Sequence, residues 1–239
     1  MLDTNSLIVM GDKHTNKREF IFNRIDELLT YGKYEIIVLT PYNYAELSKY
    51  EENKNVTLLN NIDDFRFTLE DVALIQEDDL NTINNGGTLG NIFTVLIMFD
   101  LQAILSYYRH YSHNNYDQVK ALMNQITHKK SKETSVRLIV DTDRAVPESL
   151  PKIMKANAGV KVAFKPVPEA DYMLFLDGYV KGKVATPRGE NDYIYQDGED
   201  LDSFVDGLTN IVVEVEEKED ELNKPKEKKS FFSKLFRKD

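Results

Sequence analysis

The chain has 239 residues with a formal net charge of -10, and 41% of its residues are hydrophobic. This length and apolar content suit one α/β domain with a core of its own. There is no cysteine, which excludes disulfides and thiolate metal sites and fits the cytoplasm. The acidic balance argues against non-specific binding to DNA or RNA, which requires a cationic surface. Every apolar run is shorter than the roughly 20 residues that cross a bilayer.

The first motif lies between a short apolar run and a helical pattern. Leu7–Met10 predicts a buried strand, and a helix is predicted by apolar residues at helical spacing, which are Ile21, Ile25, Leu28 and Leu29. A phosphate-binding loop reads G-x-x-x-x-G-K-[ST] between a strand and a helix. Here Gly11 and Lys17 keep that spacing, whereas Asn16 replaces the second glycine and Arg18 replaces the hydroxyl residue. The pattern predicts a descendant of a phosphate-binding loop.

The two replaced positions predict that nucleotide chemistry is weak or lost. Arg18 cannot ligate Mg²⁺ as a hydroxyl does, and the Cβ of Asn16 makes a tight backbone turn less favourable. Lys17 can still reach a phosphate, and the helix N-terminus remains positive. Against this, Asp12 brings a negative charge into the loop, and Thr15 or Asn16 reads as a helix N-cap. We therefore expect no cofactor, with binding of ATP and Mg²⁺ weak or absent.

The rest of the chain alternates strands and helices, which implies parallel strands joined by right-handed crossovers. Strands are predicted over Glu35–Thr40, Val56–Leu59, Asp71–Ile75, Thr94–Phe99, Val136–Val140, Val160–Phe164 and Asn191–Gln196. Helices are predicted over residues 101–111, 116–129 and 169–176, and a loop over Asn84–Gly87. The fold class expected from this order is a three-layer α/β/α P-loop domain with a mostly parallel sheet.

Asp100 ends a predicted strand, where a Walker B motif carries the aspartate that organises Mg²⁺. The next residue is Leu101, which cannot activate water. An alternative Walker B strand is Val72–Ile75, followed by the acidic residues Glu77–Asp79, which also fit a solvated loop. Because Arg18 and Leu101 affect metal binding and water activation separately, together they favour a pseudo-ATPase without catalytic residues.

Two other groups of side chains are candidate sites. His110 and His113 share a helix face but lack a third ligand, so no metal site is expected. An aromatic cluster with polar tips comprises Tyr107, Tyr108, Tyr111 and Tyr116. This cluster fits either the edge of the core or a protein-binding surface, where tyrosine is favoured.

The composition changes near residue 214, which predicts a domain over residues 1–213 and a charged tail over residues 214–239. Residues 214–229 form a charge run with too little apolar surface to fold alone. Residues 228–238 form a short basic segment with apolar residues at helical spacing, which are Phe231, Phe232, Leu235 and Phe236. Such a segment either docks as a helix on its own domain or binds a partner or a membrane surface.

The order of these elements resembles the FtsK/SpoIIIE family of hexameric ATPases over residues 5 to about 200. Asp141–Arg144 resembles its Ala-Thr-Gln-like sensor turn, although Asp143 stands where family members usually carry Gln or Ala. Ile153–Phe164, which contains Lys155-Ala156-Asn157, resembles its I-K-A-N-x-x-x-R-I-A-F segment. The resemblance implies a RecA-like domain in which Arg144 pairs with an acid or acts as a finger in a hexamer. It implies degenerate nucleotide contacts at Gly11, Asn16, Lys17, Arg18, Asp100 and Thr142.

Within that family, the eroded loop and the acidic charge resemble the C-terminal ATPase module of EssC-like type VII secretion coupling proteins. The resemblance implies a non-hydrolysing module for substrate recognition or regulation, at the cytoplasmic face of the bacterial membrane, in a membrane-anchored parent protein. The implied partners are secreted WXG100-like helical proteins and the upstream ATPase modules, in a hexamer of the full-length protein, with no nucleic acid. The alternatives are an active P-loop ATPase that powers protein export and, disfavoured by the acidic charge, a DNA translocase.

Overall fold

The structure is a computed structural model, and it describes residues 6–128, 133–158, 160–164, 175, 184–185 and 193–196. The predicted tail, its boundary at residue 213 and most of the helix predicted over residues 169–176 lie outside these residues. Among the helices of the described part, none combines the length and apolar character needed to span a membrane.

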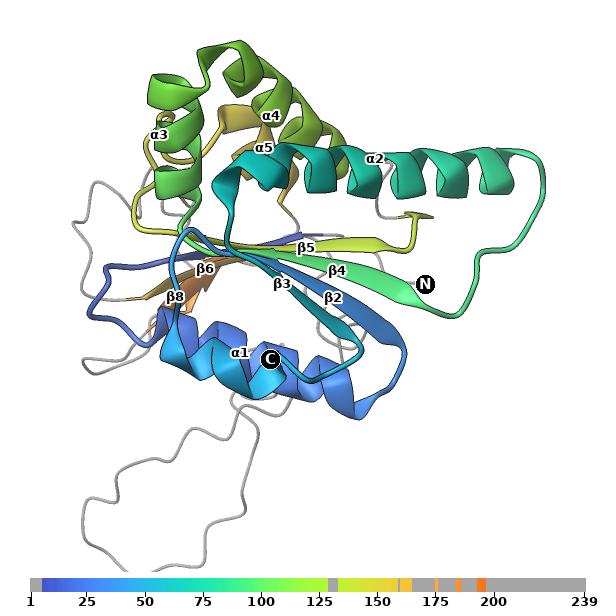
Figure 1. Cartoon of the computed structure of the whole chain (residues 1–239), viewed down its shortest axis with the longest axis horizontal. Helices are drawn as coiled ribbons and strands as arrows, with labels where there is room; N and C mark the ends of the chain where they lie inside the picture. Colours follow the sequence, from blue (N-terminus) through green and yellow to red (C-terminus); the bar gives the residue numbers. More distant parts are fainter. Residues whose placement is uncertain are drawn as a thin grey trace, which may run out of the picture.

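Strands in the described residues form one sheet in the order β3-β2-β4-β5-β1-β6-β8-β7 (Figure 1). The strands from β3 to β6 in this order are parallel, and β8 pairs antiparallel with both β6 and β7. This confirms the mostly parallel sheet. The strands are β1 Ser6–Met10, β2 Tyr34–Leu39, β3 Val56–Leu59, β4 Phe93–Met98, β5 Val136–Thr142, β6 Val160–Phe164, β7 Val184–Ala185 and β8 Tyr193–Gln196.

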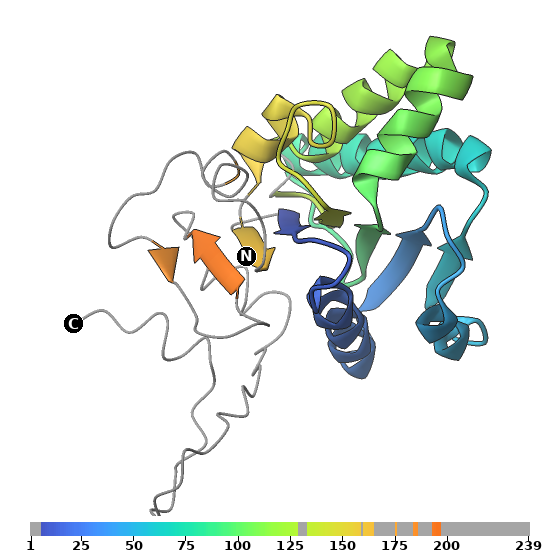
Figure 2. The ribbon, with the colours of Figure 1, turned by 90° about the vertical axis from the view of Figure 1, so that its left-hand side faces the viewer.

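Helices cover both faces of this sheet, as Figures 1 and 2 show from two sides. One face packs against α1 and η1, and the other packs against α2, α3, α4 and α5. In β1, Leu7 and Val9 belong to the first core, whereas Ile8 and Met10 belong to the second. This alternation gives the predicted three layers. The helices are α1 Lys17–Thr30, η1 Ala45–Tyr50, α2 Ile62–Asn84, α3 Leu101–Tyr111, α4 His113–Ile126 and α5 Lys152–Asn157.

One predicted strand is wrong. Asp71–Ile75 lies inside α2, so the alternative Walker B strand Val72–Ile75 does not exist. The buried residues of α2 recur at helical spacing and are Phe65, Leu69, Val72, Ala73 and Gln76. A short apolar run cannot by itself distinguish a strand from a buried stretch of helix. The acidic Glu77–Asp79 therefore lies on a helix rather than in a loop, and Asp79 accepts hydrogen bonds from the backbone N–H and hydroxyl of Ser135.

The strand order brings three chain segments to one edge of the sheet. β5 lies between β1 and β4, with Met10 opposite Thr142 and Met98 opposite Val140. Because these strands are parallel, their carboxyl ends meet at the same edge. The loop after β1, Asp100 after β4 and the turn after β5 are therefore neighbours, and this edge is the candidate site.

Candidate functional site

Gly11 joins the end of β1 to the end of β5. Its backbone N–H donates a hydrogen bond to the carbonyl oxygen of Thr142 at 3.1 Å. A Cβ placed on Gly11 would lie 2.6 Å from Oγ1 of Thr15 and 3.0 Å from Cβ of Phe164. These separations are shorter than van der Waals contact, so the close packing of the loop against β6 requires glycine at this position.

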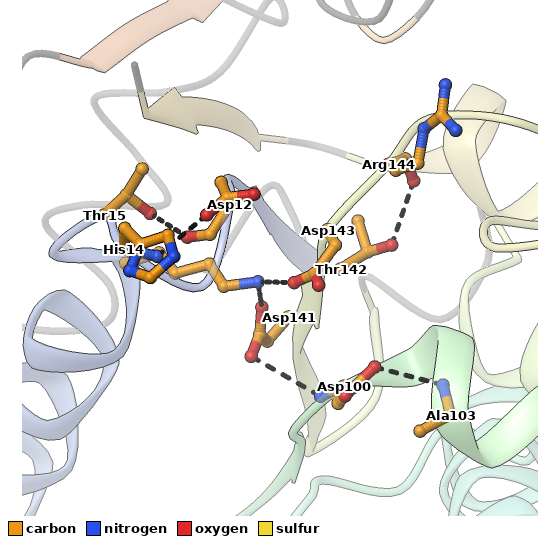
Figure 3. Close-up of polar contacts among 10 residues, drawn as sticks. Asp12, His14, Thr15, Asp100, Ala103, Asp141, Thr142, Asp143 and Arg144 are labelled. Carbon is orange, nitrogen blue, oxygen red and sulfur yellow. Dashed lines mark hydrogen bonds and ion pairs between the residues drawn. The ribbon is translucent and has the colours of Figure 1, made fainter. Parts of the chain in front are cut away.

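The loop after Gly11 folds back on Asp12 in a tight turn, which Figure 3 shows. The carbonyl oxygen of Asp12 accepts hydrogen bonds from the backbone N–H of Thr15 at 3.0 Å and from its hydroxyl at 2.6 Å. The Asp12 carboxylate accepts a hydrogen bond from the backbone N–H of His14 at 3.0 Å. A phosphate-binding loop presents such N–H groups to its ligand. Here two of them donate to Asp12 instead.

Lys17, the first residue of α1, lies between two carboxylates. Its Nζ is 2.6 Å from Oδ1 of Asp141, and it also pairs with the carboxylate of Asp143 (Figure 3). The side chains of Lys17 and Asp141 are each 1% exposed, whereas that of Asp143 is 39% exposed. The contact with Asp141 is an ion pair without hydrogen-bond geometry at Oδ1. The ammonium group that would contact a phosphate is thus already paired with two anions of the chain.

The environment of Asp141 makes its negative charge costly. Its complete burial raises the pKa of the carboxyl group, and the nearby carboxylates of Asp143 and Asp100 raise the pKa further. Lys17 lowers this pKa through its charge and its contact, without cancelling the effect of burial. Lys17 is therefore the counter-ion that favours the ionised form of Asp141.

Asp100 lies at the predicted position after β4, but its carboxylate caps a helix. The side chain accepts a hydrogen bond from the backbone N–H of Ala103 at 3.0 Å, at the N-terminus of α3. Its backbone is left-handed, with φ of 50°, which aspartate tolerates better than most residues. Its N–H faces Oδ2 of Asp141 at 3.4 Å. The next residue, Leu101, is fully buried in the core on the α2 side of the sheet.

Arg18 is held by an aromatic ring. Its guanidinium carbon lies 4.4 Å from the ring centroid of Tyr44, and that ring packs edge-on against Phe99 at 5.5 Å. The Nε atom of Arg18 and the hydroxyl oxygen of Tyr44 are both buried without a hydrogen-bond partner. A cation over a tyrosine ring is an attractive contact. This contact keeps the Arg18 guanidinium against Tyr44, and Arg18 stands in the sequence where a phosphate-binding loop carries its hydroxyl residue.

Two other predicted site residues have structural contacts. Thr142 is fully buried, and its hydroxyl donates to the carbonyl oxygen of Arg144 at 2.9 Å. Asn16 occupies the N-cap position of α1, as one of the two predicted caps, but its side chain makes no capping hydrogen bond. Its backbone φ is -78°, so this turn does not require glycine there. Within the described residues, no group of three or more His, Asp or Glu side chains could hold a metal ion.

The tyrosine cluster contains both a buried and an exposed member. Tyr108 is buried and links two helices, because its hydroxyl donates to the carbonyl oxygen of Ile62 and accepts from the backbone N–H of Arg66 at 3.1 Å. Tyr107 donates to the Asp63 carboxylate at 2.7 Å. Tyr111 is 81% exposed. The cluster therefore contains both a core residue and a surface residue.

The family resemblance assigned most of these residues to one candidate site, but the sequence analysis missed three contacts. It did not predict the pairing of Lys17 with Asp141 and Asp143, the turn closed by Asp12, or the stacking of Arg18 on Tyr44. A signal for the first contact existed, because Asp141 and Asp143 lie at the end of one predicted strand and Lys17 follows another, and these two strands can be neighbours. No pattern in the sequence pointed to Tyr44.

The sheet order and the strand–loop–helix at its edge define an α/β fold of the P-loop type. The chain is similar to the pCW3 conjugation coupling protein TcpA, in a monomer form with ATPγS, with a TM-score of 0.63, 11% identity, and coverage of 87% of this chain and 65% of TcpA. No protein-family model matches the chain. No curated protein matches it in sequence.

Two type VII secretion proteins share this fold. EssC (ATPases 2 and 3) from Geobacillus thermodenitrificans has a TM-score of 0.55 and 9% identity, with 87% of this chain and 43% of EssC covered. The cytoplasmic domain of the type VII secretion ATPase EccC from Thermomonospora curvata has a TM-score of 0.58 and 9% identity, with 81% and 25% covered. The chain thus spans less than two thirds of TcpA, EssC and EccC as matched here. The comparisons confirm the predicted resemblance and the fold.

A second structure of EccC adds a bound molecule. It contains ATPases 2 and 3 in complex with a signal sequence peptide, with a TM-score of 0.52, 11% identity, and 86% of this chain and 41% of EccC covered. EssC and EccC each carry several ATPase domains.

Proposed function

We propose that this chain is a non-hydrolysing module of a type VII secretion coupling ATPase, which contributes substrate recognition or regulation. The observation that carries the proposal is the Lys17 ammonium, which lies buried between the carboxylates of Asp141 and Asp143. In a working P-loop domain, this lysine contacts the β- and γ-phosphates of the nucleotide. Here the chain itself supplies the anions.

A nucleotide would have to break this contact before it could use the lysine. Removing the partner of a buried ion pair costs about 3–5 kcal/mol, because the other charge stays buried. That cost corresponds to a loss of about two to four powers of ten in affinity. A phosphate that displaced Asp141 would also leave two like charges close together. The residues at this edge therefore do not fit a Mg²⁺-nucleotide.

Two further positions support the same proposal. Arg18 replaces the hydroxyl ligand of Mg²⁺, and its guanidinium stacks on Tyr44. Leu101, where the family carries a glutamate that activates water, is buried in the core. Metal binding and water activation are thus affected by separate changes, in addition to the pairing of Lys17.

We further propose that the partners are secreted WXG100-like helical proteins and the upstream ATPase modules of the same protein. The EccC structure with a signal sequence peptide and the multiple ATPase domains of EssC and EccC support this proposal. In this proposal the module works at the cytoplasmic face of the bacterial membrane, within a hexamer of the full-length protein. The net charge of -10 disfavours nucleic acid as a partner.

Nucleotide titration tests the first part of the proposal. Labelled ATP is titrated into the purified chain with and without Mg²⁺, and turnover is measured in the same samples. We expect neither micromolar binding nor turnover. A Lys17→Arg variant, which keeps the positive charge, distinguishes turnover by this chain from that of a contaminant. Micromolar, Mg²⁺-dependent binding with turnover that Lys17→Arg abolishes would establish an active ATPase instead.

Partner binding tests the second part. The chain is mixed separately with a secreted helical-hairpin protein and with duplex DNA, and both titrations are followed by calorimetry at two salt concentrations. We expect modest binding of the helical protein that changes little with salt, as an amphipathic helix in an apolar groove would bind. Tight DNA binding that falls steeply with salt, with no binding of the protein, would favour a translocase.

A further inference from the structure

The outer face of α2 combines exposed apolar side chains with negative charge. Phe67 is 53% exposed and Leu74 is 57% exposed, and both lie on the side of the helix opposite its buried residues. Asp71 and Asp78 lie on the same stripe, because residues seven apart share one face of a helix. We call the stripe formed by Phe67, Asp71, Leu74 and Asp78 the acidic face of α2.

The charge of this helix is almost entirely of one sign. Its acidic residues are Asp63, Asp64, Glu70, Asp71, Glu77, Asp78 and Asp79. Its only basic residue is Arg66, which pairs with Glu70 and lies over the ring of Phe67 at 4.0 Å. Single exposed apolar residues are common on protein surfaces. Two apolar residues in one stripe, within a helix this acidic, instead suit a partner that is both apolar and basic.

The last residues of the chain have that chemistry. Residues 228–238 contain apolar side chains at helical spacing, which are Phe231, Phe232, Leu235 and Phe236. The same segment carries Lys228, Lys229, Lys234, Arg237 and Lys238 and no acidic residue. Both segments therefore combine apolar side chains with charge, and the charge of the basic segment is opposite in sign to that of the acidic face of α2.

The connection between the two segments is long enough. Residues 197–227 separate β8 from the basic segment, and a stretch of about 30 residues can reach at most about 100 Å. The 23 residues of α2 give a helix about 35 Å long. Because the two segments belong to one chain, their contact is intramolecular and requires less affinity than a contact between separate molecules.

We propose that the basic segment, residues 228–238, docks on the acidic face of α2 of its own chain. Its phenylalanines then cover Phe67 and Leu74, and its lysines face Asp71 and Asp78. This contact is independent of the proposed function. The helix α2 lies on the opposite face of the sheet from α1 (Figures 1 and 2), and it takes no part in the contacts of Lys17.

Paramagnetic relaxation in the full chain tests the docking. The chain has no cysteine, so a nitroxide can be placed at Ser233→Cys alone and the amide signals of the chain recorded. We expect signals of the acidic face of α2 to be broadened and those of exposed Asn23 on α1 to be unchanged. As a control, chain that carries the nitroxide but no isotope is mixed with isotope-enriched chain that carries no nitroxide. The signals of the enriched chain should show no broadening in this mixture. Broadening that appears only in this mixture, or no broadening of α2 in either sample, overturns the proposal.

Charge reversal gives the matched control. Asp71→Lys with Asp78→Lys should abolish the broadening of α2, and adding Lys229→Glu with Lys234→Glu should restore it. Glu51→Lys with Glu52→Lys, at exposed positions after η1, makes the same change in net charge and should leave the broadening intact. Persistence of the broadening in the α2 variant overturns the proposal. Vesicles of anionic lipid give a second outcome that overturns the proposal. If the basic segment binds these vesicles, and the signals of α2 are not broadened when vesicles are absent, the segment is a membrane-binding segment instead.

Discussion

The Nζ atom of Lys17 lies 2.6 Å from Oδ1 of Asp141, and both side chains are 1% exposed. The two residues are far apart in the sequence and meet because β1 and β5 are neighbours in the sheet. The pair fastens the N-terminus of α1 to the carboxyl end of β5. A residue that binds phosphate in related folds thus has a structural role in this chain, and this role can be tested by measuring stability.

We expect Lys17→Met to lower the free energy of unfolding by about 3–5 kcal/mol, because it leaves the buried Asp141 without its counter-ion. Urea unfolding of both proteins measures this difference. Lys49→Met is the matched control, because the pair of Lys49 with Asp26 is about half exposed on each side. Exposed pairs contribute about 0–1 kcal/mol, so this control should change little. Equal effects of the two substitutions would contradict a structural role for Lys17.

The pH dependence of the Lys17→Met effect follows from Asp141. Burial raises the pKa of Asp141 in the folded chain above its ordinary value of 3.8. The folded chain therefore takes up this proton more readily than the unfolded chain, so the contribution of Asp141 to stability rises as pH falls through the folded pKa. Without Lys17 the pKa rises further, and the protonated group needs no counter-ion. We expect Lys17→Met to be less destabilising at pH 5 than at pH 8, in urea titrations.

Asp141→Asn provides the control for this dependence. The amide cannot ionise, so the cost of Lys17→Met measured in the Asp141→Asn background should be nearly the same at both pH values. A double-mutant cycle over the two substitutions isolates the pair from the effect of each side chain alone. A pH difference that survives in this background would have to come from another group.

The sequence predicted the central strands well because they are buried on both faces. β1, β4 and β5 are rich in apolar residues, and every residue of β1 and β5 is buried, which is typical of parallel strands covered by helices. The same periodicity failed at Asp71–Ile75, where four apolar residues in a row belong to a helix. The local run is compatible with both structures, and only packing against β5 and α4 decides between them.

The sequence indicated which residues belong to the candidate site, but not which side chains contact one another. Spacing indicated that Lys17 and Asp100 follow apolar strands, and the family resemblance added Thr142. That β1, β4 and β5 lie side by side came only from the structure. Which carboxylate Lys17 contacts depends on side-chain directions, and these follow from burial at the end of β5. The stacking of Arg18 on Tyr44 depends on the path of the chain after β2, which carries no local signal.

Gly11→Ala should be destabilising because of the space around it. The new Cβ would lie 2.6 Å from Oγ1 of Thr15 and 3.0 Å from Cβ of Phe164. Overpacking of this kind costs about 1–3 kcal/mol. Gly90→Ala is the control, because no atom lies within 4 Å of its added Cβ. Thermal unfolding of the two variants measures the difference, and a Gly11→Ala variant as stable as Gly90→Ala would show that the loop adapts freely.

Restoring the loop sequence alone should not restore nucleotide binding. Asn16→Gly with Arg18→Thr recreates the glycine and the hydroxyl of a phosphate-binding loop, but Lys17 stays paired with Asp141 and Asp143. We therefore expect no micromolar binding of ATP with Mg²⁺ in that double variant, by calorimetry. Adding Asp143→Asn removes the partly exposed member of the pair and frees one side of the ammonium, so binding should become measurable. The single variant Asp143→Asn keeps the native Asn16 and Arg18. It should still show no measurable binding of ATP with Mg²⁺, because Mg²⁺ lacks its hydroxyl ligand. Micromolar binding by the double variant would mean that the loop residues, rather than the carboxylates around Lys17, are what excludes the nucleotide.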